Sequence, residues 1–495
     1  MHGLKRLFGR THSIAPETPL LLFNTLTKSK EPFALLPHAR EARMYNCGPT
    51  VYGTQHIGNL SMFVFTDILR RTLQYNGFGV KQVINFTDFG HLTSDADEGE
   101  DKMMKGLKRE GLKPSLENMK KMGRMYADAF KADIAALNID VGSIAFPFAS
   151  EYVPAQIAMI QTLEEKGYAY RAKNGVYFDT ARFPGYGKLG AIQMEGQRAG
   201  ARVERDPEKR SPSDFLLWKS DAKKTGWESP WGLGFPGWHI ECSAMINSIL
   251  GKQIDIHTGG IEHIPVHHNN EIAQSEAATG KSPLARFWMH REHLRMADQK
   301  IAKSEGNTVV LSDIVSKGFH PLALRYLFLG SHYRTPANFS WEALESAQMS
   351  LLRLQRFVGA HDGDGTPIPE WQKKIRERLN DDLDTPGALA LVWEMIKDPA
   401  LSPADVRASV RDADKVFGLS LGSPDEKTAA LSAKVFGVPV ALETLPERIR
   451  DIVEAREAAR NEKNWAQADQ LRAELLKLNY AIEDTAEGPR IFRKE

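Results

Sequence analysis

The sequence predicts an α/β protein built on a doubly wound parallel sheet, and two segments carry that prediction. The first has a strand pattern at 42–46, a loop rich in Gly and Pro, a helical pattern at 59–76 and a second strand at 80–86. This order makes a βαβ unit. The second segment, 254–260, resumes with a strand and a loop. Ligands of such sheets bind at loops that leave the carboxyl ends of the strands.

The helix at 59–76 follows from the spacing of its apolar residues. They recur at helical intervals, and Gly77 stands where a helix would end; the apolar set is Leu60, Phe63, Val64, Ile68, Leu69 and Leu73. In the later strand, Ile254 and Ile256 alternate with polar residues before a Thr-Gly-Gly turn.

The rest of the chain divides by pattern. A length of 495 residues is too much for one core, so several domains are expected. The pattern predicts an N-terminal extension at 1–20, two halves of the doubly wound fold at 21–150 and 236–308, and an insertion at 151–235. After about residue 308 the pattern is mostly helical, with linkers expected at 361–369 and 420–425.

The C-terminal segment has a pattern of its own. Residues 446–478 carry two helical patterns separated near Asn464, which is suited to cap the second helix. Short strands are expected at 480–483 and 490–493. Trp465 lies on a helical stripe and is expected in the core, although it and Phe492 are also candidates for stacking on bases.

Composition sets limits on the class of protein. The net charge of +1 means that any nucleic acid must be bound by local basic patches. No apolar run reaches the roughly 18 residues that span a bilayer, so we expect a cytoplasmic protein that does not bind membranes. An acidic run at 94–101 fits the calcium-loop pattern poorly and is expected to be a solvated loop.

Four residues suggest a zinc site. His267 and Glu271 are four residues apart in a helical run that ends at Gly280, so both can face one metal ion. Cys242 is expected at the start of another helix, where the helix dipole would stabilise a thiolate. Cys47 lies in the first βα loop. Taken singly, the His267/Glu271 pair is explained by a surface interaction, and each cysteine by an inert position in the core. Together the four residues make a plausible set of zinc ligands.

Two further segments suggest a nucleotide site. Residues 55–59 (QHIGN) lie at the start of the first helix, where backbone donors and an imidazole can meet phosphate oxygens. Lys300 and Lys303 occupy a loop that is bounded by Gly306. Taken alone, residues 55–59 are explained by an ordinary start of a helix, and the two lysines by a solvated loop.

These two segments resemble the HIGH and KMSKS signatures of class I aminoacyl-tRNA synthetases. Within that class, four other segments are similar to the cysteine-specific family: CGPTVY at 47–52, PGWHIECS at 236–243, DIHTGG at 255–260 and HHNNE at 267–271. The resemblance runs from about residue 22 to the C-terminus. Asn59 replaces the last histidine of the first signature, and Ile301 and Ala302 replace methionine and serine of the second.

The resemblance implies a role for each site residue. One Zn²⁺ would be bound by Cys47, Cys242, His267 and Glu271. His56, Lys300 and Lys303 would act in catalysis; ATP, with Mg²⁺, would be bound by His56, Asn59, His257, Gly259, Gly260 and Lys303; cysteine would be bound by Gly48, Thr87, Trp238 and Glu262, with Glu262 facing its ammonium. The two loop lysines are retained, so activity is expected despite the three replacements.

The resemblance also implies partners. L-cysteine, ATP and cysteine tRNA would be substrates of a monomeric enzyme, with a stem-contact segment at 309–345, a helical bundle at 346–425 and an anticodon-binding domain at 430–495. Zinc would distinguish the cysteine thiolate from the serine hydroxyl, which shape alone does poorly. Two alternatives remain: a cysteine ligase with a small amino-sugar acceptor, and a synthetase-like RNA-binding protein that no longer catalyses activation.

Overall fold

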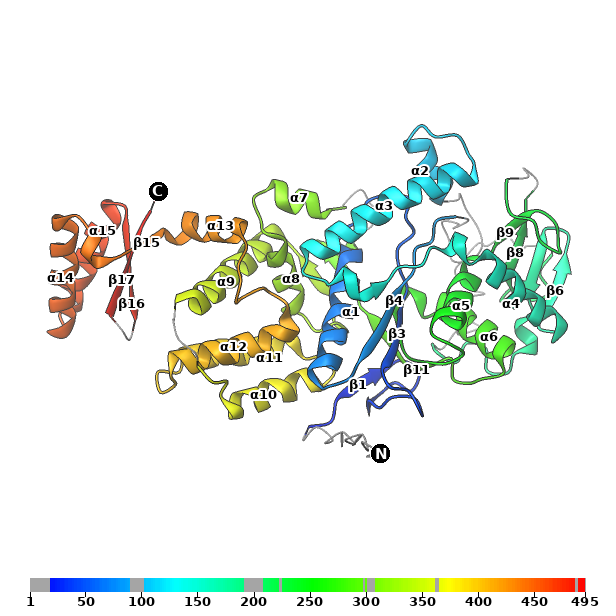
Figure 1. Cartoon of the computed structure of the whole chain (residues 1–495), viewed down its shortest axis with the longest axis horizontal. Coiled ribbons are helices and arrows are strands. Elements are labelled where there is room, and N and C mark those ends of the chain that lie inside the picture. The colour runs from blue at the N-terminus through cyan, green and yellow to red at the C-terminus, as the bar shows by residue number, and fades with distance from the viewer. Residues whose placement is uncertain are drawn as a thin grey trace, which may run out of the picture.

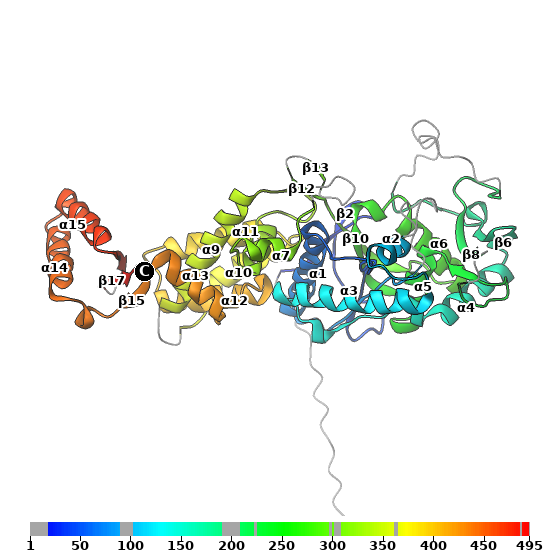
Figure 2. The same cartoon turned by 90° about the horizontal axis from the view of Figure 1, so that it is seen from above.

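The computed structural model describes residues 18–89, 102–190, 208–221, 225–296, 299–300, 308–360, 365–485 and 488–494. The chain is elongated, with an antiparallel sheet at one end, a parallel sheet and helices in the middle, and a small α/β unit at the other end (Figures 1 and 2). Among the described residues, no helix is both long and apolar enough to cross a membrane.

The central sheet confirms the doubly wound fold. Its five strands run in the order β11-β10-β3-β4-β5, and every neighbouring pair is parallel. The strands are β3 (Ala42–Asn46), β4 (Val80–Ile84), β5 (Ile144–Ala145), β10 (Ile254–Gly260) and β11 (Ala285–Arg291). The chain moves outward from β3 to β5 and later returns to β10 on the other side. The switch point therefore lies between β3 and β10, where ligands of this fold bind.

The first helix, α1 (Ile57–Tyr75), joins β3 to β4 as expected. Its apolar residues are divided between two clusters, which explains why most of the helix is buried. Leu60 and Phe63 join a cluster shared with the helical bundle, whereas Phe65 and Leu69 pack with residues of the central strands. Thus α1 lies between the nucleotide fold and the bundle.

In the described part of the chain, five α-helices lie in the segments that connect the strands β4, β5, β10 and β11 of the central sheet. They are α2 (Lys102–Arg109), α3 (Leu116–Ala136), α4 (Val153–Glu165), α5 (Trp238–Ile249) and α6 (His267–Thr279). Between α4 and α5 lies an antiparallel sheet of β6 (Ala169–Ala172), β7 (Gly175–Phe178), β8 (Phe215–Ser220) and β9 (Gly234–Pro236). In chain order this antiparallel sheet interrupts the parallel fold. Near the N-terminus, β1 (Leu21–Asn24) and β2 (Ser29–Pro32) form a hairpin.

Helices dominate after residue 308. The bundle and the short elements that lead into it are α7 (Leu311–Ser316), α8 (Pro321–Leu329), α9 (Trp341–Ala360), α10 (Pro369–Asn380), α11 (Thr385–Lys397), α12 (Pro403–Phe417) and α13 (Glu426–Phe436). A small sheet of β12 (Leu294–Met296), β13 (Gln299–Lys300) and β14 (Ala337–Phe339) lies at the transition.

A buried charge network joins α1 to the bundle. The Asp67 carboxylate, in the middle of α1, is 2.7 Å from Arg325 Nη2, 2.8 Å from Arg70 Nη2 and 2.7 Å from Arg71 Nε. Arg325, on α8, also donates to the carbonyls of Phe417 (2.6 Å) and Leu137 (2.9 Å). The side chains of Asp67 and Arg325 are fully buried. We call Asp67, Arg70, Arg71 and Arg325 the Asp67 network.

The C-terminal unit has its own apolar core. It contains α14 (Glu447–Asn461), α15 (Trp465–Lys477) and a sheet of β15 (Val438–Val440), β16 (Tyr480–Thr485) and β17 (Gly488–Arg493). Asn464 caps α15 as predicted, accepting a hydrogen bond from Gln467 N at 3.3 Å. The expected core position of Trp465 is wrong, because this side chain is 57% exposed. Asp469, Arg472 and Leu476 on the same face of α15 are exposed as well.

Candidate metal centre and nucleotide site

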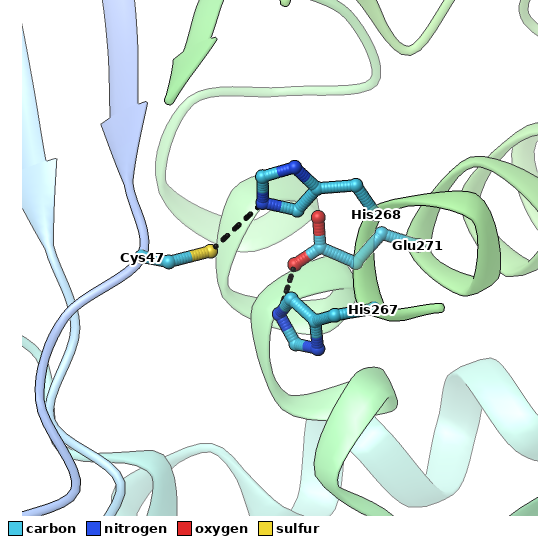
Figure 3. A group of neighbouring side chains, drawn as sticks. All are labelled: Cys47, His267, His268 and Glu271. Atoms are coloured by element: carbon cyan, nitrogen blue, oxygen red, sulfur yellow. Dashed lines mark hydrogen bonds and ion pairs between the residues drawn. The ribbon is translucent and has the colours of Figure 1, made fainter. Parts of the chain in front are cut away.

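Four buried side chains converge beside the switch point of the sheet. Cys47 follows β3, and His267, His268 and Glu271 lie on the first turns of α6 (Figure 3). One ligand atom from each of the four lies within 4.8 Å of the others. The Cys47 sulfur is 3.3 Å from His268 Nε2, and Glu271 Oε1 is 3.0 Å from His267 Nε2. The predicted i, i+4 pair thus shares one face of a helix that ends at Gly280.

The carboxylate of Glu271 is enclosed by imidazoles. Its second oxygen, Oε2, is 2.7 Å from Nε2 of His257 on β10. Burial alone would raise the pKa of Glu271, but His257 and His267 lower it well below the ordinary value. Burial opposes protonation of His267, yet Glu271 and Cys47 raise its pKa to about 10. Such a dry, charge-rich group is stable only when its charges are balanced.

Cys242 lies beside Cys47 and outside the group of four. The two thiols share a hydrogen bond, and both are buried. Burial alone would raise the pKa of Cys47, but its bond with Cys242 and the neighbouring imidazoles of His268 and His267 hold that pKa well below normal. Burial and Cys47 raise the pKa of Cys242. The two thiols therefore do not titrate independently.

The expected position of Cys242 at a helix start is wrong. Helix α5 begins at Trp238, so Cys242 lies in its second turn and away from the positive end of the dipole. What faces the Cys242 thiol is Cys47 and the hydroxyl of Tyr45. The low-pKa thiol of this pair is consequently Cys47.

The donor set fits zinc. Two sulfurs, imidazoles and a carboxylate are the ligands that Zn²⁺ takes in proteins, and four ligands on a tetrahedral ion lie about 3.3–3.8 Å apart. Of these donors, one ligand atom each of Cys47, His267, His268 and Glu271 already lies within 4.8 Å of the others. His268 is a donor that the sequence did not single out, although its place beside His267 was a signal.

A polar chain holds His268 from behind. Its Nδ1 is 2.8 Å from Nε2 of His290 on β11, and Nδ1 of His290 is 2.7 Å from the hydroxyl of Thr25. Burial lowers the pKa of His268 to about 4. A second polar partner of this kind is typical of a histidine at a metal site, because it fixes the ring orientation.

Of the residues expected to bind cysteine, Trp238 and Gly48 lie directly beside this cluster. The Trp238 ring stacks on His267 with centroids 4.1 Å apart. Thr87 donates to Glu241 at 2.8 Å, and Gly48 N donates to the Asn85 side chain at 2.9 Å. A Cβ at Gly48 would lie 1.6 Å from the Asn85 carbonyl oxygen, so only glycine fits there. Glu262 is half exposed, with its carboxylate 3.6 Å from His293.

Two of the three β10 residues expected to bind ATP, His257 and Gly259, face the cluster of His268 and Glu271. The His257 ring is fully buried, contacts Glu271 and stacks on Trp288 at 4.6 Å. Gly259 and Gly260 follow in the same strand, and a Cβ on Gly259 would press on His263 and His268. His257 thus supports Glu271 directly.

The first signature begins α1. His56 is the N-cap residue of the helix, and its Nδ1 accepts from Asn59 N at 3.2 Å. The Asn59 side chain donates to Gln55 Oε1 at 2.6 Å. Ile57 N donates to the carbonyl of Val309 at 2.8 Å, so the chain after the second signature is joined to the first. This juxtaposition is what a shared nucleotide site requires.

Only the edge of the second signature can be described. Lys300 lies in β13, which pairs with β12 opposite Arg295. Lys303, Ile301 and Ala302 lie outside the described residues, as do the acidic run at 94–101 and residues 1–17.

Comparison with known structures shows the class. A Mycobacterium tuberculosis methionyl-tRNA synthetase in complex with methionyl-adenylate aligns with a TM-score of 0.54 and 14% identity, covering 79% of this chain and 93% of that one. Residues 35–349 match the family described as the class I (C) tRNA synthetase catalytic domain, and 442–489 match the cysteinyl-tRNA ligase anticodon-binding domain. The fold and these matches define a class I aminoacyl-tRNA synthetase.

Comparison with curated sequences narrows the class. The cysteine–tRNA ligase 1 of Burkholderia lata is 44% identical, with 96% of this chain and 97% of that protein covered. The cysteine–tRNA ligases of Treponema denticola (40% identical; 94% and 98% covered) and Thermus thermophilus (41%; 95% and 98%) are also similar. The chain belongs to the cysteine–tRNA ligase family and is a ligase.

Proposed function

We propose that this chain joins cysteine to cysteine tRNA with ATP and selects cysteine through a zinc ion held by Cys47, Cys242, His267 and Glu271. The observation that carries the proposal is the buried Cys/His/Glu cluster at the switch point of the sheet. When bound, zinc would ligate the substrate sulfur, which a soft-ligand metal prefers to a hydroxyl. His268 is the neighbouring donor that could replace Cys242 in the shell.

The chain's own residues would prepare the first step. The cysteine carboxylate attacks the α-phosphorus of ATP, a new O–P bond forms, and the bond to the bridging oxygen breaks as pyrophosphate leaves. His56 at the start of α1, with Lys300 and Lys303, would stabilise the charge that grows on the phosphates. Asn59, Gly259 and Gly260 would line the ATP site, and Mg²⁺ would accompany the nucleotide.

The cysteine side of the pocket would be shaped by four groups. Gly48 lets the loop that carries Cys47 pack against the Asn85 carbonyl, and Thr87 is fixed by Glu241. Trp238 covers His267. Glu262 offers a carboxylate for the substrate ammonium. His257, expected beside the adenosine, is better placed to orient Glu271.

In the second step a ribose hydroxyl at the 3′ end of the tRNA attacks the carbonyl carbon of the adenylate, and AMP leaves. We assign tRNA contacts to the stem-contact segment at 309–345, the bundle at 346–425 and an anticodon-binding domain at 430–495. The exposed Trp465, with Arg460 5.8 Å from its ring, is suited to stack on an unpaired base. Phe492 is buried and unsuited to that role. We further propose a monomer in the cytoplasm.

The decisive assay is cysteine-dependent exchange of pyrophosphate into ATP, with serine as the control amino acid and zinc measured in the same preparation. Exchange with cysteine and about one zinc per chain are expected. Exchange that ignores cysteine would contradict the proposal. Charging of tRNA by the full chain separates this function from ligation to an amino sugar, which would need no C-terminal unit.

A further inference from the structure

One arginine joins the bundle to the C-terminal unit. Arg356 lies on α9, and its guanidinium carbon is 3.8 Å from the ring centre of Phe492 and 4.8 Å from that of Phe436. Its Nη2 also forms an ion pair with Glu483. Phe492 and Glu483 belong to β17 and β16, and Phe436 ends α13. A single side chain therefore contacts both sides of the junction.

The remainder of the junction is loosely filled. Neither Phe436 nor Phe492 belongs to any of the five apolar clusters formed by the described residues. A cavity of about 640 Å³ lies along the junction, lined by residues of α9, α13, β15 and β17. In Figures 1 and 2 the C-terminal unit extends from the bundle beyond α13. Without a shared core, the angle of the unit depends on a few contacts.

We propose that Arg356 is a positioning residue for tRNA charging, which fixes the angle of the C-terminal unit on the bundle. A planar cation held between two rings and paired with a carboxylate is directional, and lysine cannot reproduce that geometry fully. A tRNA held by the C-terminal unit would then have its 3′ end directed to the nucleotide site. The inference rests on the proposed function, since it takes tRNA as the acceptor.

Loss of this contact should separate two activities. Amino-acid activation needs only the catalytic half, so it should not depend on the angle of the C-terminal unit. Charging needs both ends of the tRNA to be engaged at once. If the free unit samples many angles, only a fraction of the molecules can bind tRNA productively, and the apparent affinity falls by that fraction.

The test uses the full-length protein with Arg356→Met, Arg356→Lys and Glu483→Gln, and Arg40→Met as the control, because Arg40 is exposed and lies outside the segments assigned to tRNA contacts. In Arg356→Met we expect KM for tRNA to rise about tenfold. We expect its kcat, and cysteine-dependent pyrophosphate exchange, to stay within about twofold of wild type. Arg356→Lys and Glu483→Gln should show intermediate KM values, and the control should match wild type.

Small-angle X-ray scattering gives a readout that is independent of activity. The maximum dimension or the flexibility of Arg356→Met should increase relative to wild type and the control. Unchanged scattering together with an unchanged KM for tRNA would overturn the proposal, as would a parallel loss of pyrophosphate exchange. If wild type activates cysteine but charges no tRNA, the proposed function fails, whereas a scattering change would still support the role of Arg356 in holding the unit.

Discussion

Replacement of Arg325 by methionine tests the Asp67 network. Arg325 makes three buried contacts: the Asp67 carboxylate and the carbonyls of Phe417 and Leu137. In the variant the Asp67 carboxylate is still paired with Arg70 and Arg71. The carbonyls of Phe417 and Leu137, however, lose their hydrogen-bond donor. A buried acceptor without a partner costs about 1–3 kcal/mol, and a broken buried ion pair about 3–5 kcal/mol. We expect a loss of about 4 kcal/mol.

Calorimetry of the purified protein would measure this loss. At about 2–4 °C per kcal/mol for a unit of this size, the transition that contains the bundle should fall by roughly 10 °C. Arg353→Met, on an exposed position of α9, is the matched control and should leave the transition unchanged. The double variant Asp67→Asn/Arg325→Met should lose less than the sum of the single variants, because the two groups are coupled. A shift of under about 2 °C in Arg325→Met would refute the reasoning.

Three further predictions concern the site and pH. Cys242→Ser should release zinc and lower the preference for cysteine over serine, and unchanged metal content in this variant would remove that thiol from the zinc ligands. If His268 supports the ligands without binding zinc itself, His268→Gln should weaken zinc binding about 10–100-fold. Gly48→Ala should displace the loop that carries Cys47 and lower the free energy of unfolding by about 1–3 kcal/mol, because the new Cβ would clash with the Asn85 carbonyl. Unfolding experiments and zinc content measure this effect, and normal values for both would contradict the clash. Burial raises the pKa of Asp133 to about 6, so ionisation of this group opposes folding, and the stability of the protein should fall as pH rises from about 4 to 6. Asp133→Asn should therefore stabilise the protein by about 1 kcal/mol at pH 7, a value discounted for partial exposure, and should have no effect near pH 3. An equal effect at both pH values would disprove this.

Much of the nucleotide fold could be predicted because its signals are local. The helix expected at 59–76 spans Ile57–Tyr75, and the strand expected at 80–86 ends at Ile84. Spacing also placed His267 and Glu271 on one helix face. In each case the pattern within about twenty residues contains the physical cause.

Other features depend on packing between distant segments. His268 joins the cluster because β3 ends beside it and places Cys47 there. The spacing of residues within the helix does not show where another segment ends. The stripe that carries Trp465 indicated a covered face, but this side chain is exposed. The partners of Arg356 lie up to 136 positions away in the chain, so the sequence showed only an ordinary arginine on a helix.

The Asp67 network also limits how this protein can be shortened. Because Arg325 and the carbonyl of Phe417 complete a structure that starts inside α1, a fragment cut after the nucleotide fold would leave a buried carboxylate with fewer cations and an apolar helix face open to water. Leu419 and Leu421 belong to the same cluster as Leu60. The smallest stable piece for crystallography or engineering should therefore extend to residue 421, and trimming should begin only beyond that point.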